Sequence, residues 1–209
     1  MHRRPAFWTL LVAIAVVAWL LKPAGPRSFR NLPPTGHGDW IAFGDSLTSG
    51  YGASEGMDFP SQLTRRLGIT IRNFGAPGDT TQGALSRLEA AAKSQPRVVL
   101  LCLGGNDGLQ QMSRDQMFRN LGVMIDRFHS GGAFVVLIGV RSATVRDKND
   151  KPFEELARAK KVLLVPNVLD GLLTDPRLMS DTIHPNDAGY ERIAEKINRA
   201  LTPILEQLR

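Results

Sequence analysis

Cysteine is nearly absent from this chain of 209 residues, since Cys102 is the only one. One cysteine can form neither a disulfide within the chain nor a cysteine-based metal cluster, so the redox compartment is left open. The glycine signatures of nucleotide binding are missing too, because the chain contains neither G-x-x-x-x-G-K nor G-x-G-x-x-G. These absences argue against a disulfide scaffold, a phosphate-loop enzyme and a dinucleotide-binding enzyme.

An excess of basic charge is also missing from most of the chain. The formal net charge is +6, but five of the 26 basic residues precede the first acidic residue, Asp39. Beyond residue 30 the balance is 21 basic against 20 acidic residues. The positive charge therefore belongs to the N-terminal tail, and we expect no nucleic-acid partner. A hydrophobic content of 43% and a charged content of 22% are typical of one globular domain.

One uncharged run stands at the N-terminus, where residues 6–21 read AFWTLLVAIAVVAWLL behind a basic start. This is the pattern of a signal peptide or of a short membrane anchor. Lys22, Pro23 and Pro26 lie where a signal peptide would carry small residues, which favours an uncleaved anchor. A helix of this length extends about 24 Å, short of a hydrocarbon core of about 30 Å. We expect residues 1–22 to be an anchor or a signal segment that places the domain outside the cytoplasm.

Proline and glycine then dominate residues 23–38, which predicts a linker. From residue 39 onward, short apolar runs alternate with helical patterns, and the domain is predicted to span 39–209. The expected strands are 40–43, 69–73, 98–103, 133–140 and 162–165, and the expected helices are 59–67, 80–93, 114–129, 154–160 and 188–208 with an interruption at Pro203. This alternation predicts an α/β fold with a parallel sheet covered on both faces. In such sheets ligands bind beyond the carboxyl ends of the strands.

Polar motifs follow the first three expected strands. Ser46 lies in the block Gly-Asp-Ser-Leu-Thr after the first strand, on a turn that suits a nucleophile, although Gly-Asp-Ser is also common turn chemistry. This block is not G-x-S-x-G, which argues against an α/β-hydrolase elbow. Gly78 precedes Asp79 at the start of a predicted helix, where backbone amides favour an anion, although loop geometry with Asp79 as the helix N-cap explains the same residues. Asn106, in Gly-Gly-Asn-Asp after the third strand, has an amide that can donate to an oxyanion, although taken alone the motif is also an ordinary turn.

Near the C-terminus, Asp181 and His184 stand three residues apart in Asp-Thr-Ile-His-Pro. A carboxylate that orients an imidazole makes a general base, but this pair is also consistent with a surface ion pair or with half of a metal site. No second histidine lies at ligand spacing, so we expect no metal. His129 is expected to end a helix as a cation near the negative end of its dipole.

Two further residues have structural explanations. Cys102 lies within an apolar strand and is expected in the core. Arg141 follows the fourth strand, where it could meet a substrate carboxylate, although pairing at the sheet edge is favoured.

Taken together and in this order, the four motifs resemble the GDSL or SGNH hydrolase superfamily over about residues 39–200. The resemblance implies a flavodoxin-like three-layer α/β/α sandwich with about five parallel strands. It also implies that Ser46 is the nucleophile, that Asp181 and His184 complete a triad, and that the oxyanion hole consists of the Ser46 and Gly78 amides and the Asn106 side chain. No metal or organic cofactor is implied.

The wording of the motifs is most similar to the bacterial thioesterase I, lysophospholipase and arylesterase group. The resemblance therefore implies a serine esterase that cleaves small-molecule or lipid esters or thioesters through an acyl-enzyme. In that group, the loop and helix that correspond to residues 141–162 frame the acyl pocket. Here this segment is short and polar, so the acyl-chain preference of the group does not transfer. A carbohydrate O-acetylesterase or an acyltransferase would use the same residues. A membrane-tethered binding module that retained the fold is the alternative without catalysis. The sequence does not decide the oligomeric state.

Overall fold

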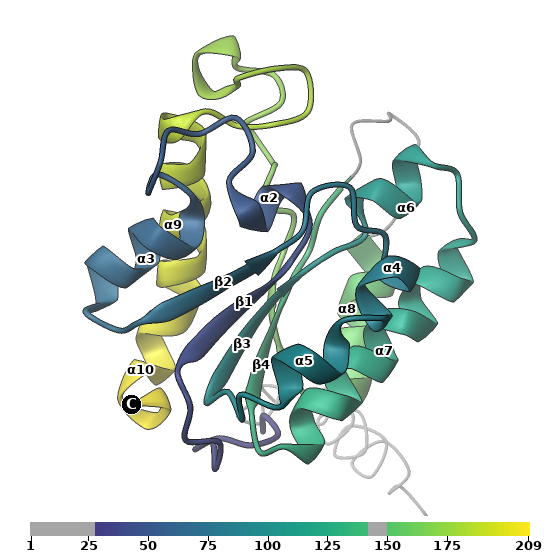
Figure 1. Cartoon of the computed structure of the whole chain (residues 1–209), viewed down its shortest axis with the longest axis vertical. Coiled ribbons are helices and arrows are strands. Elements are labelled where there is room, and N and C mark those ends of the chain that lie inside the picture. The colour runs from purple at the N-terminus through teal and green to yellow at the C-terminus, as the bar shows by residue number, and fades with distance from the viewer. Residues whose placement is uncertain (1–27, 142–149) are drawn as a thin grey trace, which may run out of the picture.

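The computed structural model describes residues 28–141 and 150–209, and its centre is one five-stranded parallel sheet. The strand order is β2-β1-β3-β4-β5 (Figure 1). The strands are β1 (Trp40–Gly44), β2 (Ile71–Gly75), β3 (Val98–Cys102), β4 (Phe134–Ile138) and β5 (Leu163–Val165). The chain leaves β1 toward β2 on one side and reaches β3 on the other, so the carboxyl ends of β1 and β3 form the switch point at which such sheets bind ligands.

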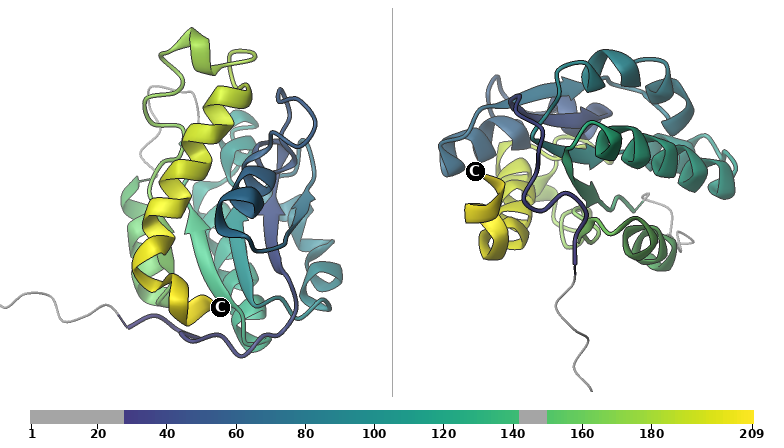
Figure 2. Two further views of the ribbon diagram at one scale, coloured as in Figure 1. Left: turned by 90° about the vertical axis from the view of Figure 1, so that its left-hand side faces the viewer. Right: turned by 90° about the horizontal axis from the view of Figure 1, so that it is seen from below.

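Helices cover both faces of the sheet, which confirms the predicted three-layer sandwich (Figures 1 and 2). One face is covered by α3 (Phe59–Leu67), α9 (Asp187–Leu201) and α10 (Leu205–Leu208), and the other by α4 (Thr81–Leu85), α5 (Leu88–Ala92), α7 (Arg114–Ser130) and α8 (Asp150–Lys160). Alternate residues of each central strand enter the two cores: Ala42 packs with the α3 and α9 side, and Phe43 with the α7 side. The strands are therefore apolar on both faces, as a parallel sheet requires.

Several element boundaries differ from the sequence-based prediction. The second strand lies two residues later than expected, because parallel pairing matches Ile71 with Trp40 and Gly75 with Gly44. The helix expected over 80–93 is two short helices, α4 and α5, separated at Ser86 and Arg87. The helix expected from residue 154 begins at Asp150. Three short turns of helix were not expected: α2 (Ser46–Ser49), α6 (Gly105–Leu109) and η1 (Pro176–Leu178). The predicted interruption near Pro203 is present as η2 (Thr202–Ile204).

The described part of the expected linker, residues 28–38, packs against the domain (Figure 2). The Phe29 ring meets the Phe134 ring edge-on at 5.8 Å between centroids. The Asn31 amide donates to the main-chain oxygens of His129 and Ala133, at 2.9 Å each. The composition of this segment predicted a linker, and in the structure these long-range contacts attach its described part to the N-terminal edge of the sheet.

Two single residues had expected structural roles. Cys102 is buried in β3, as predicted. His129 does lie in the last turn of α7, but the prediction that it is a cation there is wrong. Its side chain is buried, both ring nitrogens lack hydrogen-bond partners, and burial lowers its pKa to about 4.

The expected anchor, residues 6–21, lies outside the described residues. In the ranges that the structure does describe, no helix combines the length and the apolar character needed to cross a membrane.

Candidate active site

Ser46 lies on a tight turn that returns over the end of β1. Asp45 caps α2, and its Oδ1 accepts a hydrogen bond from the Leu47 amide at 3.0 Å. The turn requires glycine at position 44, because a Cβ atom there would lie 2.0 Å from Thr48 Oγ1 and 2.3 Å from the Cys102 carbonyl oxygen. Ser46 itself is half-buried at the first position of α2. The strand end thus presents the serine at the carboxyl edge of the sheet.

The carboxyl group of Asp45 is buried beneath this turn, with 2% of the residue exposed. Burial raises its pKa to about 7, and the nearby carboxylates of Asp107 and Asp79 add to the shift, while backbone hydrogen bonds oppose it. The group next to Ser46 is therefore largely uncharged below neutral pH.

Asp181 and His184 form a compact unit in the loop before α9. The Asp181 Oδ2 atom lies 2.8 Å from His184 Nδ1, and its Oδ1 accepts from the backbone amides of Ile183 and His184 at 2.7 Å each. Burial by itself would raise the pKa of Asp181, but the hydrogen bonds from the His184 ring and from the two amides outweigh it and lower that pKa. An ionised carboxylate only accepts hydrogen bonds, so it places the proton of the neutral imidazole on Nδ1.

The free ring nitrogen of His184 faces the serine. His184 Nε2 lies 3.0 Å from Ser46 Oγ. The Tyr51 ring packs on the imidazole with 4.5 Å between centroids and a tilt of 50°. Tyr51 is bound to the nucleophile turn through its amide, which donates to the Ser46 carbonyl oxygen at 3.0 Å. Serine, histidine and aspartate are thus joined by two hydrogen bonds in the order that acyl transfer uses.

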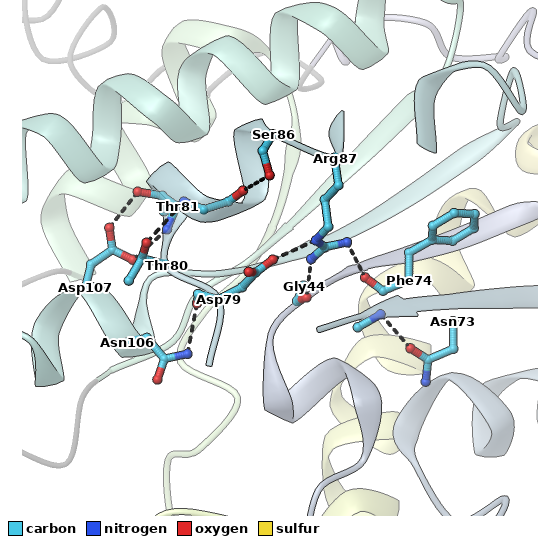
Figure 3. A network of polar contacts seen from close by, with 12 residues as sticks. Gly44, Asn73, Phe74, Asp79, Thr80, Thr81, Ser86, Arg87, Asn106 and Asp107 are labelled. Carbon is cyan, nitrogen blue, oxygen red and sulfur yellow. Dashed lines mark hydrogen bonds and ion pairs between the residues drawn. The ribbon is translucent and has the colours of Figure 1, made fainter. Parts of the chain in front are cut away.

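Asn106 and Gly78 approach the same edge from β3 and β2, the two strands that flank β1. Asn106 lies in α6 after β3, and its Nδ2 donates to the Asp79 carbonyl oxygen at 2.9 Å (Figure 3). An amide has two N–H bonds, so the second remains for another acceptor. Gly78, in the turn just before Asp79, is solvent-exposed with a φ of +84°, a conformation that favours glycine.

A buried polar group holds these two loops together. Asp107 accepts from the Thr81 amide at 2.8 Å and from the Thr81 hydroxyl at 2.6 Å (Figure 3). The Asn120 amide of α7 donates to the same hydroxyl at 3.1 Å. Asp107 is 2% exposed, so its hydrogen bonds act in a low-dielectric environment. The residue after Asn106 is thereby attached to the start of α4, close to Gly78 in sequence.

Ser46 and Asn106 also line one small, mainly apolar cavity of about 30 Å³. Its apolar wall consists of Leu47, Leu109, Val140, Leu169, Leu173 and Ile183. The cavity adjoins the serine hydroxyl and is large enough for only a few heavy atoms. An acyl group attached to Ser46 would have this space beside it.

The structure also accounts for residues that the sequence left open or did not indicate. Arg141 forms an ion pair with Asp150 at 3.9 Å, in agreement with the expected pairing at the sheet edge. Ser54 lies in Gly-Ala-Ser-Glu-Gly, a G-x-S-x-G match, but it is in a loop where its amide donates to Asp187. The sequence did not predict the contribution of Tyr51, Arg87 or buried Asp107 to this site, because contacts between distant segments define it. Within the described ranges, no group of three or more histidine, cysteine, aspartate or glutamate residues is arranged to hold a metal ion.

Comparison with known proteins identifies similar chains. Residues 42–192 match the model of the GDSL-like lipase/acylhydrolase family. The esterase TesA of Pseudomonas aeruginosa is 30% identical over 177 residues, which cover 79% of this chain and 88% of that protein. An arylesterase of Vibrio mimicus is 31% identical, with 77% of this chain and 86% of that protein covered. Thioesterase 1/protease 1/lysophospholipase L1 of Escherichia coli is also 31% identical, with coverages of 79% and 84%.

Solved structures are similar over the same part of the chain. The crystal structure of TesA has a TM-score of 0.74 and 29% sequence identity, and the comparison covers 79% of this chain and 98% of that one. AlinE4, an SGNH-hydrolase family esterase, has a TM-score of 0.63 and 30% identity, with coverages of 82% and 97%. The architecture and the order of the motifs are therefore those of SGNH hydrolases.

Proposed function

This chain belongs to the GDSL-like lipase/acylhydrolase family and is a serine ester hydrolase, and from that premise we propose that Ser46, His184 and Asp181 form its catalytic triad. The observation that carries the proposal is the hydrogen-bonded series from Ser46 Oγ through the His184 ring to Asp181, with distances of 3.0 Å and 2.8 Å. Because the chain is an ester hydrolase, the alternative of a binding module without catalysis is excluded.

In the acylation step, His184 Nε2 removes the proton of the Ser46 hydroxyl while Oγ forms a bond to the substrate carbonyl carbon. The imidazolium is stabilised by the Asp181 carboxylate at 2.8 Å from Nδ1. When the tetrahedral intermediate collapses, the bond to the leaving oxygen or sulfur breaks and His184 gives that atom its proton. The products are the free alcohol or thiol and an acyl ester on Ser46.

Deacylation repeats the sequence with water. His184 removes a proton from a water molecule as its oxygen attacks the acyl carbon, and then returns a proton to Ser46 Oγ as the acid leaves. The negative oxygen of both intermediates receives hydrogen bonds from the Ser46 and Gly78 amides and from the second N–H of Asn106. The anchoring of Asn106 on the Asp79 carbonyl oxygen supports this role, since it leaves that N–H free.

The decisive experiment compares the full chain with its Ser46→Ala variant on p-nitrophenyl esters and on an acyl thioester. We expect Ser46→Ala to fold normally, to lose nearly all turnover and to lose labelling by a fluorophosphonate probe. Ser54→Ala is the matched control, because Ser54 carries the competing G-x-S-x-G motif and should be dispensable. Retained turnover in Ser46→Ala, or loss of labelling in Ser54→Ala alone, would refute the assignment.

We propose further that the substrates carry short acyl groups, since the cavity beside Ser46 has a volume of only about 30 Å³. An O-acetylated carbohydrate fits the same limit and is the alternative substrate class. Release of acetate from acetylated sugars, compared with hydrolysis of simple acetyl and butyryl esters, separates the two.

Residues 1–22 are proposed to carry the catalytic domain out of the cytoplasm and to associate it with the membrane. The uncharged run 6–21 behind a basic start supports this proposal. In a bacterial host, the tagged full chain should be found in the membrane or periplasmic fraction, whereas a chain lacking residues 1–22 should stay in the cytoplasm. Identical distribution of the two would count against the proposal.

A further inference from the structure

Arg87 stands at the break between α4 and α5, and its side chain extends to the carboxyl ends of β1 and β2 (Figure 3). Its guanidinium group donates three hydrogen bonds in three directions. Nε meets Asp79 Oδ2 at 2.6 Å, Nη1 meets the Phe74 carbonyl oxygen at 2.7 Å, and Nη2 meets the Gly44 carbonyl oxygen at 2.7 Å. The same group lies over the Phe43 ring, 4.1 Å from its centroid.

Each of the three acceptors lies within four residues of a group that the proposed mechanism assigns to the oxyanion hole. Gly44 lies two residues before Ser46, and its carbonyl oxygen also accepts from the Ala76 amide at 2.9 Å. Phe74 is the last residue but one of β2, which leads into the turn that contains Gly78. Asp79 directly follows Gly78, and its own carbonyl oxygen holds the Asn106 amide. One side chain thus connects the segments that supply all three donors.

We propose that Arg87 is the positioning residue of the oxyanion hole, fixing the Ser46 turn, the Gly78 turn and the Asn106 amide relative to one another. The inference rests on the proposed function, because it concerns the same site. Arg87 is absent from the wall of the cavity beside Ser46 and acts only through the residues that it binds.

Arginine suits this position because of the shape of its charged group. Its guanidinium is planar and has separate donors on Nε, Nη1 and Nη2, so one group can bind acceptors from three segments at fixed angles. The Arg87 and Asp79 side chains are only 25% and 21% exposed, which limits the screening of their pairing by solvent. A lysine ammonium could keep the ion pair with Asp79, but it could not reach both carbonyl oxygens in the same geometry.

The test compares Arg87→Lys with the wild-type full chain by steady-state kinetics on one p-nitrophenyl ester. We expect kcat to fall by about 10- to 100-fold, part of the loss seen when an oxyanion donor is removed outright, while KM changes little. Arg127→Lys is the matched control: Arg127 makes a similar two-pronged pair with Glu89, at 2.7 and 2.8 Å, away from the site. This control should keep wild-type kcat.

A second measurement separates positioning from general loss of structure. If Arg87 acts through the oxyanion hole, its substitution should cost less in an Asn106→Ala background than in the wild type, because one of the three donors that it positions is already absent. The inference would be overturned if the two substitutions together lowered kcat by the product of their separate factors. An unchanged kcat in folded Arg87→Lys would also overturn it.

Should Arg87→Lys fail to fold, Asp79→Asn provides the same test, because it weakens one of the three contacts and keeps an acceptor. It should lower kcat about three- to tenfold with KM retained, and an unchanged kcat would again overturn the inference.

Ser46→Ala is assayed alongside, to distinguish failure of the proposed function from failure of this inference. If Ser46→Ala retains turnover, the proposed function fails. An inactive Ser46→Ala beside a fully active Arg87→Lys refutes only the role of Arg87.

Discussion

His184 Nε2 lies 3.0 Å from Ser46 Oγ, although 138 positions separate the two residues along the chain. The loop that follows α2 and the loop that carries His184 approach so closely that glycine is needed between them. A Cβ atom on Gly52 would lie 2.9 Å from the Pro185 carbonyl oxygen and equally close to Ser180. The base therefore reaches the serine because the loop before α9 packs directly on the loop after α2.

Asp181→Asn should lower kcat by about three to four orders of magnitude without unfolding the protein. The asparagine oxygen can still accept from the amides of Ile183 and His184, which hold this loop. Its NH₂ group, however, would donate to His184 Nδ1, so the ring proton would move to Nε2 and the ring could not accept the serine proton. Steady-state kinetics and a melting curve check this, with Asp175→Asn, at a half-buried carboxylate that pairs with Arg177 instead of a histidine, as control. A loss of less than about tenfold would contradict the assigned role.

Gly75→Ala should damage both stability and activity. A Cβ atom at this position would lie 2.2 Å from the Ser49 amide nitrogen and 2.6 Å from its Cα, so α2 would have to move away from β2. We expect a loss of about 1 to 3 kcal/mol in the free energy of unfolding, and a fall in kcat that persists in the folded fraction. Gly68→Ala is the control: its φ is positive, at +65°, so alanine strains the backbone there, but nothing lies within 4 Å of the added Cβ atom. It should cost about 1 to 2 kcal/mol and leave kcat unchanged.

Hydrolysis of p-nitrophenyl esters should be fastest between acetyl and butyryl, because the cavity beside Ser46 is about 30 Å³. Leu173→Ala should shift the optimum toward longer acyl chains by enlarging that cavity. Leu85→Ala, at a partly buried position in the other core, should leave the optimum where it is. A wild-type optimum at octanoyl or longer would mean that the acyl chain is bound elsewhere.

His129→Leu should stabilise the protein most at acid pH. The pKa of His129 is about 4 in the folded state, below its ordinary value of 6.5, so the unfolded chain binds more protons between these values. The contribution of neutral His129 to the free energy of unfolding of the wild type is fully present above pH 6.5 and is lost as pH falls toward 4. In urea unfolding, the variant should exceed the wild type in free energy of unfolding at pH 5. This excess should be about 2 kcal/mol larger at pH 5 than at pH 8. An equal gain at both values would exclude a buried neutral imidazole.

Asp45→Asn should have the opposite dependence on pH. The pKa of Asp45 is raised from 3.8 to about 7, so the folded protein holds a proton that the unfolded chain loses in this range, and stability declines as pH rises through it. Asparagine keeps the acceptor for the Leu47 amide and does not ionise. The difference in free energy of unfolding between the variant and the wild type should therefore be about 2 to 3 kcal/mol more favourable to the variant at pH 8 than at pH 5. Urea unfolding at the two pH values measures it, and an equal gain at both would show that Asp45 is ionised throughout.

The fold was predictable because its signals are local. Alternating apolar runs and helical patterns predicted five parallel strands that are covered on both faces, and helix 59–67 was placed correctly. In the structure Asp58 caps this helix and Gly68 ends it. The prediction was wrong where a tertiary contact overrides local preference. Helix 80–93 breaks at Arg87 because that side chain is bound to Gly44, Phe74 and Asp79. Asp79, expected to cap that helix, pairs with Arg87 instead, and Thr80 provides the cap.

The sequence by itself determined the chemistry available at this site. A serine, an asparagine and an aspartate–histidine pair each lie in a short motif that can be identified without coordinates, and their order along the chain identified the family. The tertiary structure decided how these groups meet: the contact between His184 and Ser46, the burial of Asp45, the neutral His129 and the three bonds of Arg87. All of these depend on segments far apart in the sequence, because parallel strands bring their carboxyl ends to one edge only after the whole sheet has formed.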